Sequence, residues 1–234
     1  MNENGFGQDF VLTPPPRASV AVAGETRRFA VRRIFCVALN YADHAREMGK
    51  APAAPFFFTK PADAAVDSGA AIPYPSETQN LHHEIELVAA LARGGAAISQ
   101  ERALDCVYGY AAGIDLTRRD LQTAARDAGR PWDFSKGFDF SAPVGAIRPV
   151  AEIGHPSKGR IALSVNGAIR QQGDLSDMIA STAKIIAEIS RYVALAPGDL
   201  IFTGTPAGVG PLVAGDTAEG EIAGVGAVSV AIAG

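Results

Sequence analysis

Glycine and proline recur so often along this 234-residue chain that long helices have little room, since it holds 25 Gly and 15 Pro. The segment 51–75, APAAPFFFTKPADAAVDSGAAIPYP, is interrupted by five prolines. Proline removes a backbone donor and clashes inside a helix, and both residue types favour turns. The apolar runs between them have the length and the β-branched or aromatic content of strands: residues 32–41 (RRIFCVALNY), 84–92 (EIELVAALA) and 107–116 (VYGYAAGIDL).

Three segments combine capping residues with the apolar spacing of short helices: residues 40–50, 116–129 and 178–193. In the first, Asn40 suits the N-cap position. In the second, Thr117 and Asp120 have the spacing of a capping box. With so few helices among many strands, the sequence predicts a β-rich α+β fold.

Asparagine followed by glycine predicts a two-residue hairpin turn at Asn166-Gly167, because both residues tolerate a positive φ. The strands on either side would lie within residues 161–173 (IALSVNGAIRQQG). Residues 1–30 form a short proline-containing lead-in to the main domain, and we expect no internal repeat or long linker.

Composition and charge exclude several classes of protein. The net charge of −4 provides no basic excess to neutralise phosphates, which argues against a nucleic-acid binder. No apolar run reaches the length of a membrane span, and the N-terminus lacks a secretory pattern. Cys36 and Cys106 form no CxxC or zinc pattern, so we expect two reduced thiols and a cytoplasmic protein.

Two glutamates stand two residues apart inside the apolar run LHHEIELVAA, residues 81–90. In a strand, Glu84 and Glu86 project from the same face, where the negative charge of each raises the free-energy cost of ionising the other. That face is therefore either open to water or occupied by a cation. Asp115, at the end of the next apolar strand, would complete an all-oxygen site that suits Mg²⁺ or Mn²⁺, and Ca²⁺ in crystals, better than zinc. His82 shares the glutamate face, either as a structural hydrogen-bonding residue or as a ligand.

His44 and Glu47 lie three residues apart in the first predicted helix, so they share a face and can form a hydrogen bond. A carboxylate behind an imidazole is the arrangement of a general base, although such pairs also occur on ordinary surface helices. Lys136 stands among aromatic and small residues in PWDFSKGFDFSAPVG, as a functional or a surface lysine. The run FTGTPAGVGP presents either backbone N–H groups to an anion or a set of tight turns, and it lacks the spacing of a phosphate-binding loop.

Seven motifs in order resemble the fumarylacetoacetate hydrolase family, in its short acylpyruvase branch, over residues 31–220: CVALNYADHAREMG, FFTKP, LHHEIELV, GIDLTRRDLQ, RPWDFSKGFDFSAPVG, VNGAIRQQG and PGDLIFTGTPAGVGP. The resemblance implies a mixed β-roll with a few short helices, formed by a catalytic domain over residues 31–234. It also implies a homodimer that binds a divalent metal.

Site residues follow from the same resemblance. It implies Glu84, Glu86 and Asp115 as metal ligands, and a catalytic set of His44, Glu47 and Lys136. It implies four substrate-binding residues, of which the last is the weakest match: Arg119, Gln122, Thr205 and Lys60. Leu39 stands where much of the family has the arginine of a GRNY motif, so a charge near the catalytic pair is lost.

The resemblance implies an enzyme acting on a small 2-oxo acid. We expect a metal-dependent hydrolase that cleaves the C–C bond of a 3-acylpyruvate, with fumarylpyruvate giving fumarate and pyruvate in aromatic-compound breakdown. Oxaloacetate decarboxylation and hydration or isomerisation of 2-oxo-dienoates are alternatives on the same metal–enolate platform, and a non-catalytic metal-binding protein is a third. The His44–Glu47 pair favours hydrolysis, because a decarboxylase needs no base to activate water.

Overall fold

The computed structural model describes residues 10–49 and 56–234, and the largest sheet in this part of the chain has eight strands. The strands run in the order β4-β3-β15-β8-β9-β11-β5, with β12 attached to β9. Two pairs, β15–β3 and β11–β5, are parallel, and the others are antiparallel. Their bounds are β3 (Arg33–Ala38), β4 (Phe56–Lys60), β5 (Ala65–Asp67), β8 (Ile85–Leu91), β9 (Val107–Ile114), β11 (Ala142–Val144), β12 (Arg148–Pro149) and β15 (Asp199–Phe202).

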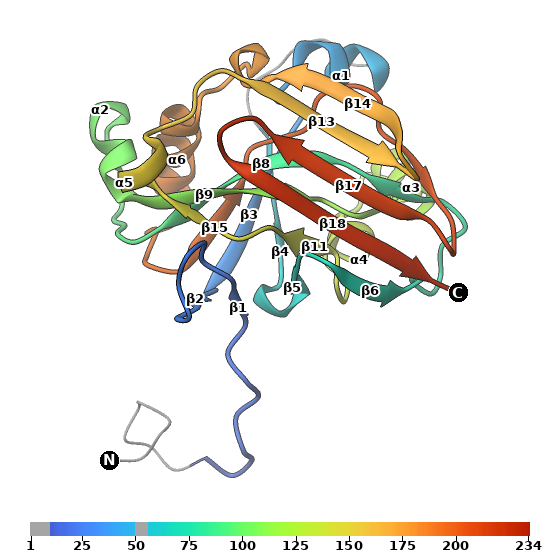
Figure 1. Cartoon of the computed structure of the whole chain (residues 1–234), viewed down its shortest axis with the longest axis horizontal. Coiled ribbons are helices and arrows are strands. Elements are labelled where there is room, and N and C mark those ends of the chain that lie inside the picture. Colours follow the sequence, from blue (N-terminus) through green and yellow to red (C-terminus); the bar gives the residue numbers. More distant parts are fainter. Residues whose placement is uncertain (1–9, 50–55) are drawn as a thin grey trace.

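A second, five-stranded sheet lies across the first one (Figure 1). Its order is β14-β13-β17-β18-β6, with bounds β6 (Ala70–Pro73), β13 (Arg160–Val165), β14 (Ala168–Asp174), β17 (Thr217–Ile222) and β18 (Gly226–Ala233). Smaller sheets are formed by β7 (Leu81–His83), β10 (Thr117–Arg118) and β16 (Gly210–Leu212), and by β1 (Ser19–Val20) with β2 (Phe29–Ala30). The architecture is the mixed, β-rich roll with few helices that the sequence predicts.

The helices are short and lie at the rim of the sheets: α1 (Ala42–Glu47), α2 (Gln100–Ala103), α3 (Arg119–Asp127), α4 (Asp133–Lys136), α5 (Val150–Ile153) and α6 (Thr182–Tyr192). Single 3₁₀ turns are η1 (Ala62–Ala64), η2 (Leu104–Cys106) and η3 (Leu175–Asp177). Figure 1 shows α2 beside α6 at one end of the molecule and α1 near β14 at the top. Within the described residues, no helix is long and apolar enough to cross a membrane.

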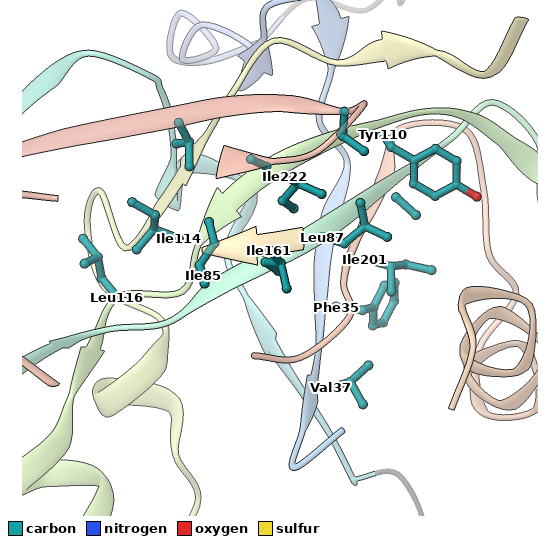
Figure 2. Packing of buried hydrophobic residues seen from close by; sticks show 14 of the residues in the cluster. Phe35, Val37, Ile85, Leu87, Tyr110, Ile114, Leu116, Ile161, Ile201 and Ile222 are labelled. Atoms are coloured by element: carbon teal, nitrogen blue, oxygen red, sulfur yellow. The ribbon is translucent and has the colours of Figure 1, made fainter. Parts of the chain in front are cut away.

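The main core fills the space between the two large sheets (Figure 2). Ile85 and Leu87 of β8 point into it together with Ile114 of β9, and Ile161 and Ile222 come from the opposite sheet. The alternate residues of the same strands face a second cluster on the other side of the eight-stranded sheet, which includes Val88, Ala90, Ala111 and Phe202. Both faces of β8 are therefore buried, which explains its nearly continuous apolar sequence.

The hairpin and the three longer helices form where the sequence predicts them. Asn166 and Gly167 have φ values of 51° and 78°, and they connect β13 to β14. The short helices α2, α4 and α5 were not predicted, because helices of four residues carry little periodicity.

The predicted caps of two helices are wrong. Asn40 does not cap α1; its side chain bonds the backbone of Ala180 and Thr203 instead. Asp120 forms no capping box with Thr117, which lies in β10, and its carboxylate accepts a hydrogen bond from Thr78. In both cases a tertiary partner outcompetes the local cap.

Candidate active site

The acidic residues of the predicted metal site extend the second face of two adjacent strands. Glu84 and Glu86 share the face of Val88 and Ala90, and Asp115 follows β9 at the same end of the sheet. The backbone N–H of Asp115 donates to the carbonyl oxygen of Glu84 at 2.8 Å, which fixes the two strand ends together. One oxygen from each of the three carboxylates lies within 4.8 Å of the others, and all three residues are buried.

Lys136, at the end of α4, supplies a positive charge that contacts two carboxylates of this cluster. Its Nζ donates to Glu84 Oε2 at 2.9 Å, to Asp115 Oδ2 at 2.7 Å and to Thr117 Oγ1 at 2.7 Å. Burial alone would lower the pKa of Lys136, but the carboxylates of Asp115 and Glu84 outweigh it and raise that pKa. The sequence left a surface lysine open as an alternative, and the structure buries the side chain at 2% exposure.

The pKa values of the two glutamates are shifted in opposite directions. Burial opposes ionisation of Glu84, but Lys136 and then Arg119 hold its pKa below the usual range. Burial, followed by the charges of Asp115 and Glu84, raises the pKa of Glu86 well above its ordinary value. Glu86 thus carries the electrostatic cost of placing three acids together, because like charges in a low-dielectric site resist simultaneous ionisation.

The cluster fits a divalent cation. Asp115 Oδ1 forms an ion pair with Lys60 Nζ at 2.8 Å, but among the described residues no donor meets this buried oxygen with hydrogen-bond geometry. Glu86 Oε2 accepts one hydrogen bond, from the backbone N–H of Gly204 at 2.6 Å. Three carboxylates without a sulfur ligand form the donor set of a hard cation such as Mg²⁺ or Mn²⁺.

Gly204 has a backbone conformation that few other residues adopt. Its φ is 99°, and a Cβ atom there would lie 2.6 Å from the Cβ of Asn40. The glycine therefore lets the chain after β15 turn tightly enough to direct an N–H group at Glu86.

His44 and Glu47 form the predicted pair on α1. His44 Nδ1 lies 3.0 Å from Glu47 Oε2, and the imidazole side chain is 6% exposed. Glu47 is held from behind, since its Oε1 accepts the backbone N–H of Gly208 at 3.0 Å. This chain of contacts fixes the ring and leaves Nε2 as the nitrogen that can exchange a proton with a substrate or water.

A cavity of about 280 Å³ brings most of the predicted residues together. It is lined by seven of them: His44, Glu84, Glu86, Arg119, Gln122, Lys136 and Thr205. Leu39 also lines it, whereas Glu47, Asp115 and Lys60 do not. Lys60 lies behind Asp115, where its Nζ also donates to the backbone oxygen of Leu116 at 3.1 Å.

Arg119 is positioned by three polar neighbours at the start of α3. It donates to Glu84 and to the amide oxygen of Gln122, and its Nε lies 3.3 Å from His82 Nδ1. Burial and then the nearby guanidinium lower the pKa of His82 to about 4. His82 is outside the carboxylate group, and its contacts with Asn80 and Arg119 are those of a structural hydrogen-bonding residue, one of the two roles that the sequence left open.

Gln171 of β14 is a connection that the sequence did not reveal. This fully buried amide donates to Thr205 Oγ1 at 2.8 Å and to the carbonyl oxygen of Pro206 at 2.9 Å. Its own oxygen accepts the backbone N–H of Ile85 at 3.1 Å and lies 2.9 Å from His83 Nδ1. Because Thr205 Oγ1 accepts from Gln171, the hydroxyl proton is free to donate into the cavity.

Known proteins share both this sequence and this fold. A fumarylpyruvate hydrolase of a Ralstonia species is 43% identical over 187 residues, which cover 80% of this chain and 97% of that protein. Human mitochondrial oxaloacetate tautomerase is 43% identical over 195 residues, covering 83% of this chain and 88% of that protein. The crystal structure of fumarylpyruvate hydrolase from Pseudomonas aeruginosa in complex with Mn²⁺ and pyruvate has 47% sequence identity and a TM-score of 0.94, covering 96% of this chain and 99% of that one.

Residues 33–233 match the family described as fumarylacetoacetate (FAA) hydrolase C-terminal. The match spans the eight-stranded sheet, the five-stranded sheet and every residue named above as lining the cavity. The resemblance carried by the seven motifs is confirmed, and the chain belongs to the fumarylacetoacetate hydrolase family.

Proposed function

We propose that the protein is a divalent-metal-dependent hydrolase that cleaves the C–C bond of a 3-acylpyruvate, with fumarylpyruvate as substrate and fumarate and pyruvate as products. One observation carries the proposal: Glu84 and Glu86 of the buried carboxylate cluster and His44 of the imidazole–carboxylate pair line the same cavity. The similarity to the fumarylpyruvate hydrolases of Ralstonia and Pseudomonas aeruginosa supports the choice of substrate.

Glu84, Glu86 and Asp115 are the residues that would hold Mg²⁺ or Mn²⁺. A cation bound there supplies charge stabilisation to the pyruvate enolate that forms when the C–C bond breaks. The Mn²⁺ in the Pseudomonas aeruginosa structure supports this assignment, as does the buried, oxygen-only donor set.

His44 acts as the general base. Its imidazole takes a proton from the water that adds to the distal carbonyl of the acylpyruvate, while Glu47 stabilises the resulting imidazolium. When the tetrahedral adduct collapses, the C–C electron pair moves to the pyruvate carbon. The proton held by the imidazole is then available to convert the enolate to pyruvate.

Lys136 and Gln122 stabilise the oxyanion of that adduct, and Thr205 donates its hydroxyl to the carboxylate at the pyruvate end. An ammonium group has three donors, and Lys136 directs its three at Glu84, Asp115 and Thr117. A cation at the carboxylates would replace those ion pairs, so that Lys136 can turn a donor toward the substrate.

Oxaloacetate chemistry is the second candidate, favoured by the 43% identity to the human oxaloacetate tautomerase. Tautomerisation and decarboxylation would use the same chelation of a 2-oxo acid without an attacking water. The His44–Glu47 pair, with its imidazole buried, favours hydrolysis over these reactions, because it provides the base that water activation requires.

We infer that residues 31–234 form the catalytic domain, that residues 1–30 are an appendage to it, and that the protein is a cytoplasmic homodimer in aromatic-compound breakdown. The family match over residues 33–233 supports the domain boundary. The family resemblance supports the homodimer, and the similarity to fumarylpyruvate hydrolases supports the metabolic role.

The test follows the loss of the ultraviolet enol absorbance of fumarylpyruvate, with Mn²⁺ or Mg²⁺ and with EDTA, beside an oxaloacetate assay. We expect EDTA-sensitive cleavage with equimolar fumarate and pyruvate. Turnover of oxaloacetate alone would replace hydrolysis by the second candidate, and inactivity toward both substrates would overturn the proposal.

A further inference from the structure

Three arginine or lysine side chains line the active-site cavity: Arg119, Arg126 and Lys136. They differ in their ion-pair partners. Arg119 and Lys136 both pair with Glu84 inside the carboxylate cluster. Arg126 instead pairs with its neighbour Asp127, whose side chain is 64% exposed and turned to solvent. An exposed pair of this kind contributes little energy, so Arg126 can exchange Asp127 for another anion at small cost.

The position of Arg126 along α3 sets how far from the metal ligands it acts. Arg119, Gln122 and Arg126 lie on one face of the helix, at i, i+3 and i+7. At 1.5 Å per residue, Arg126 Cα is about 10 Å along the helix axis from the Cα of Arg119, the residue that pairs with Glu84. An extended acylpyruvate with a terminal carboxylate spans about 8 Å between its two carboxylate carbons, counted from bonds of about 1.5 Å. The arginine side chain is long enough to cover the difference between these two lengths.

Between the two basic ends, the cavity wall is apolar and aromatic. Phe56 and Phe58 lie edge-on to Trp132, with ring centroids 5.2 Å and 5.9 Å apart, and all three residues line the cavity. Leu39 lines it without adding a charge. Flat aromatic walls suit a planar, unsaturated acyl chain, but they provide no partner for a charge at its end. Among the described residues that line this cavity, Arg126 is the cation left to meet such a charge.

We propose that Arg126 binds the carboxylate at the far end of the acyl group, so that the cavity selects acylpyruvates whose acyl chain ends in an anion. This inference deepens the proposed function and rests on it. Arg126 is a specificity residue, because it lies two helix turns along α3 from Arg119, which contacts the carboxylate cluster, and its own ion pair is with Asp127 outside that cluster.

The test compares fumarylpyruvate with 2,4-dioxohept-5-enoate, in which a methyl group replaces the terminal carboxylate. The wild-type protein should prefer fumarylpyruvate. Arg126→Gln should lower kcat/KM for fumarylpyruvate by about 10- to 100-fold, the usual effect of losing a charged hydrogen bond, and change the methyl analogue by less than about threefold. Arg126→Lys should recover part of the loss, because a lysine keeps the charge without the bidentate geometry. Arg102→Gln, an exposed arginine of α2, is the matched control and should change neither substrate.

A second readout uses the product. Inhibition by fumarate, measured with the methyl analogue as substrate, should weaken in Arg126→Gln, whereas inhibition by pyruvate should stay constant. Equal losses for both substrates, or unchanged fumarate inhibition, would overturn the role of Arg126 and leave the hydrolase intact. Failure of the wild-type protein to cleave either acylpyruvate would overturn the proposed function and this role with it.

Discussion

Replacing Lys136 by methionine tests whether a buried cation stands in for a metal at the carboxylate cluster. The ammonium lies 2.9 Å from Glu84 Oε2 and 2.7 Å from Asp115 Oδ2. At an effective dielectric constant of 20, each contact is attractive by about 6 kcal/mol, and desolvation offsets much of this. Removing one partner from a buried pair costs about 3–5 kcal/mol. Methionine retains most of the volume, so the loss reports charge rather than a cavity.

The assay is denaturation by heat and by urea, in EDTA and in saturating Mn²⁺. In EDTA, Lys136→Met should lower the melting temperature by roughly 10 °C, because each kcal/mol is worth about 2–4 °C in a protein of this size. With Mn²⁺ bound, the cation replaces the lost charge, and most of the difference should disappear. The defect in EDTA should grow between pH 5 and pH 8. Without Lys136 the pKa of Glu84 rises, and a carboxyl group with a raised pKa in the folded state destabilises the fold as the pH increases.

An exposed lysine provides the control, since Lys158→Met should change neither melting temperature by more than about 1 °C. Two results would refute the reasoning. An equal loss of stability with and without Mn²⁺ would mean that Lys136 stabilises the fold independently of the cation site. No loss in EDTA would mean that the carboxylates take up protons at negligible cost and need no cation.

Three further predictions concern the same site. His44→Asn should lower kcat by about 10²- to 10⁴-fold, with Mn²⁺ affinity unchanged in calorimetry; full turnover would exclude the imidazole as the base. Gln171→Glu replaces the N–H group that donates to Thr205 by a carboxylate oxygen, which would accept the hydroxyl proton of Thr205 and turn it away from the substrate. We expect KM to rise about tenfold, with circular dichroism as the check on folding. Burial and then neighbouring carboxylates raise the pKa of Glu86, so Mn²⁺ must displace a proton from this side chain when it binds. The affinity of the protein for Mn²⁺ should therefore rise with pH, by up to tenfold per pH unit below that pKa, and Glu86→Gln should abolish this pH dependence.

Local chemistry made much of the fold predictable. The turn at Asn166 needs only two adjacent residues that tolerate a positive φ, and the alternation along β8 and the residue before it places Glu84 and Glu86 on one face without knowledge of the rest of the chain. The His44–Glu47 contact also lies within one helix turn. These signals span a few residues each, which is why they survive in a single sequence.

The remaining features depend on segments that are distant in sequence. Asn40 bonds two carbonyl groups 140 and 163 residues away instead of capping its own helix. Gln171 forms hydrogen bonds to both Ile85 and Thr205. In the sequence it is only one more polar residue in a predicted strand, and nothing nearby marks it as buried. In the sequence, Arg126 looks like any charged residue on an exposed helix face, and only the structure shows that it lines the cavity. No local pattern distinguishes such residues from ordinary surface or turn positions.

The core explains how the fold can hold repelling carboxylates together. Ile85 and Leu87 are fully buried on one face of β8, while Glu86 projects from the other. A slip of one residue would exchange the two sets, moving the apolar side chains to the carboxylate face and forcing charges into the main core. Each of these apolar side chains contributes about 1.5–3 kcal/mol by its burial. The strand is therefore anchored strongly enough to keep Glu84, Glu86 and Asp115 adjacent, and their repulsion, which Lys136 only partly relieves, is the source of the affinity for a divalent cation that we propose for this cluster.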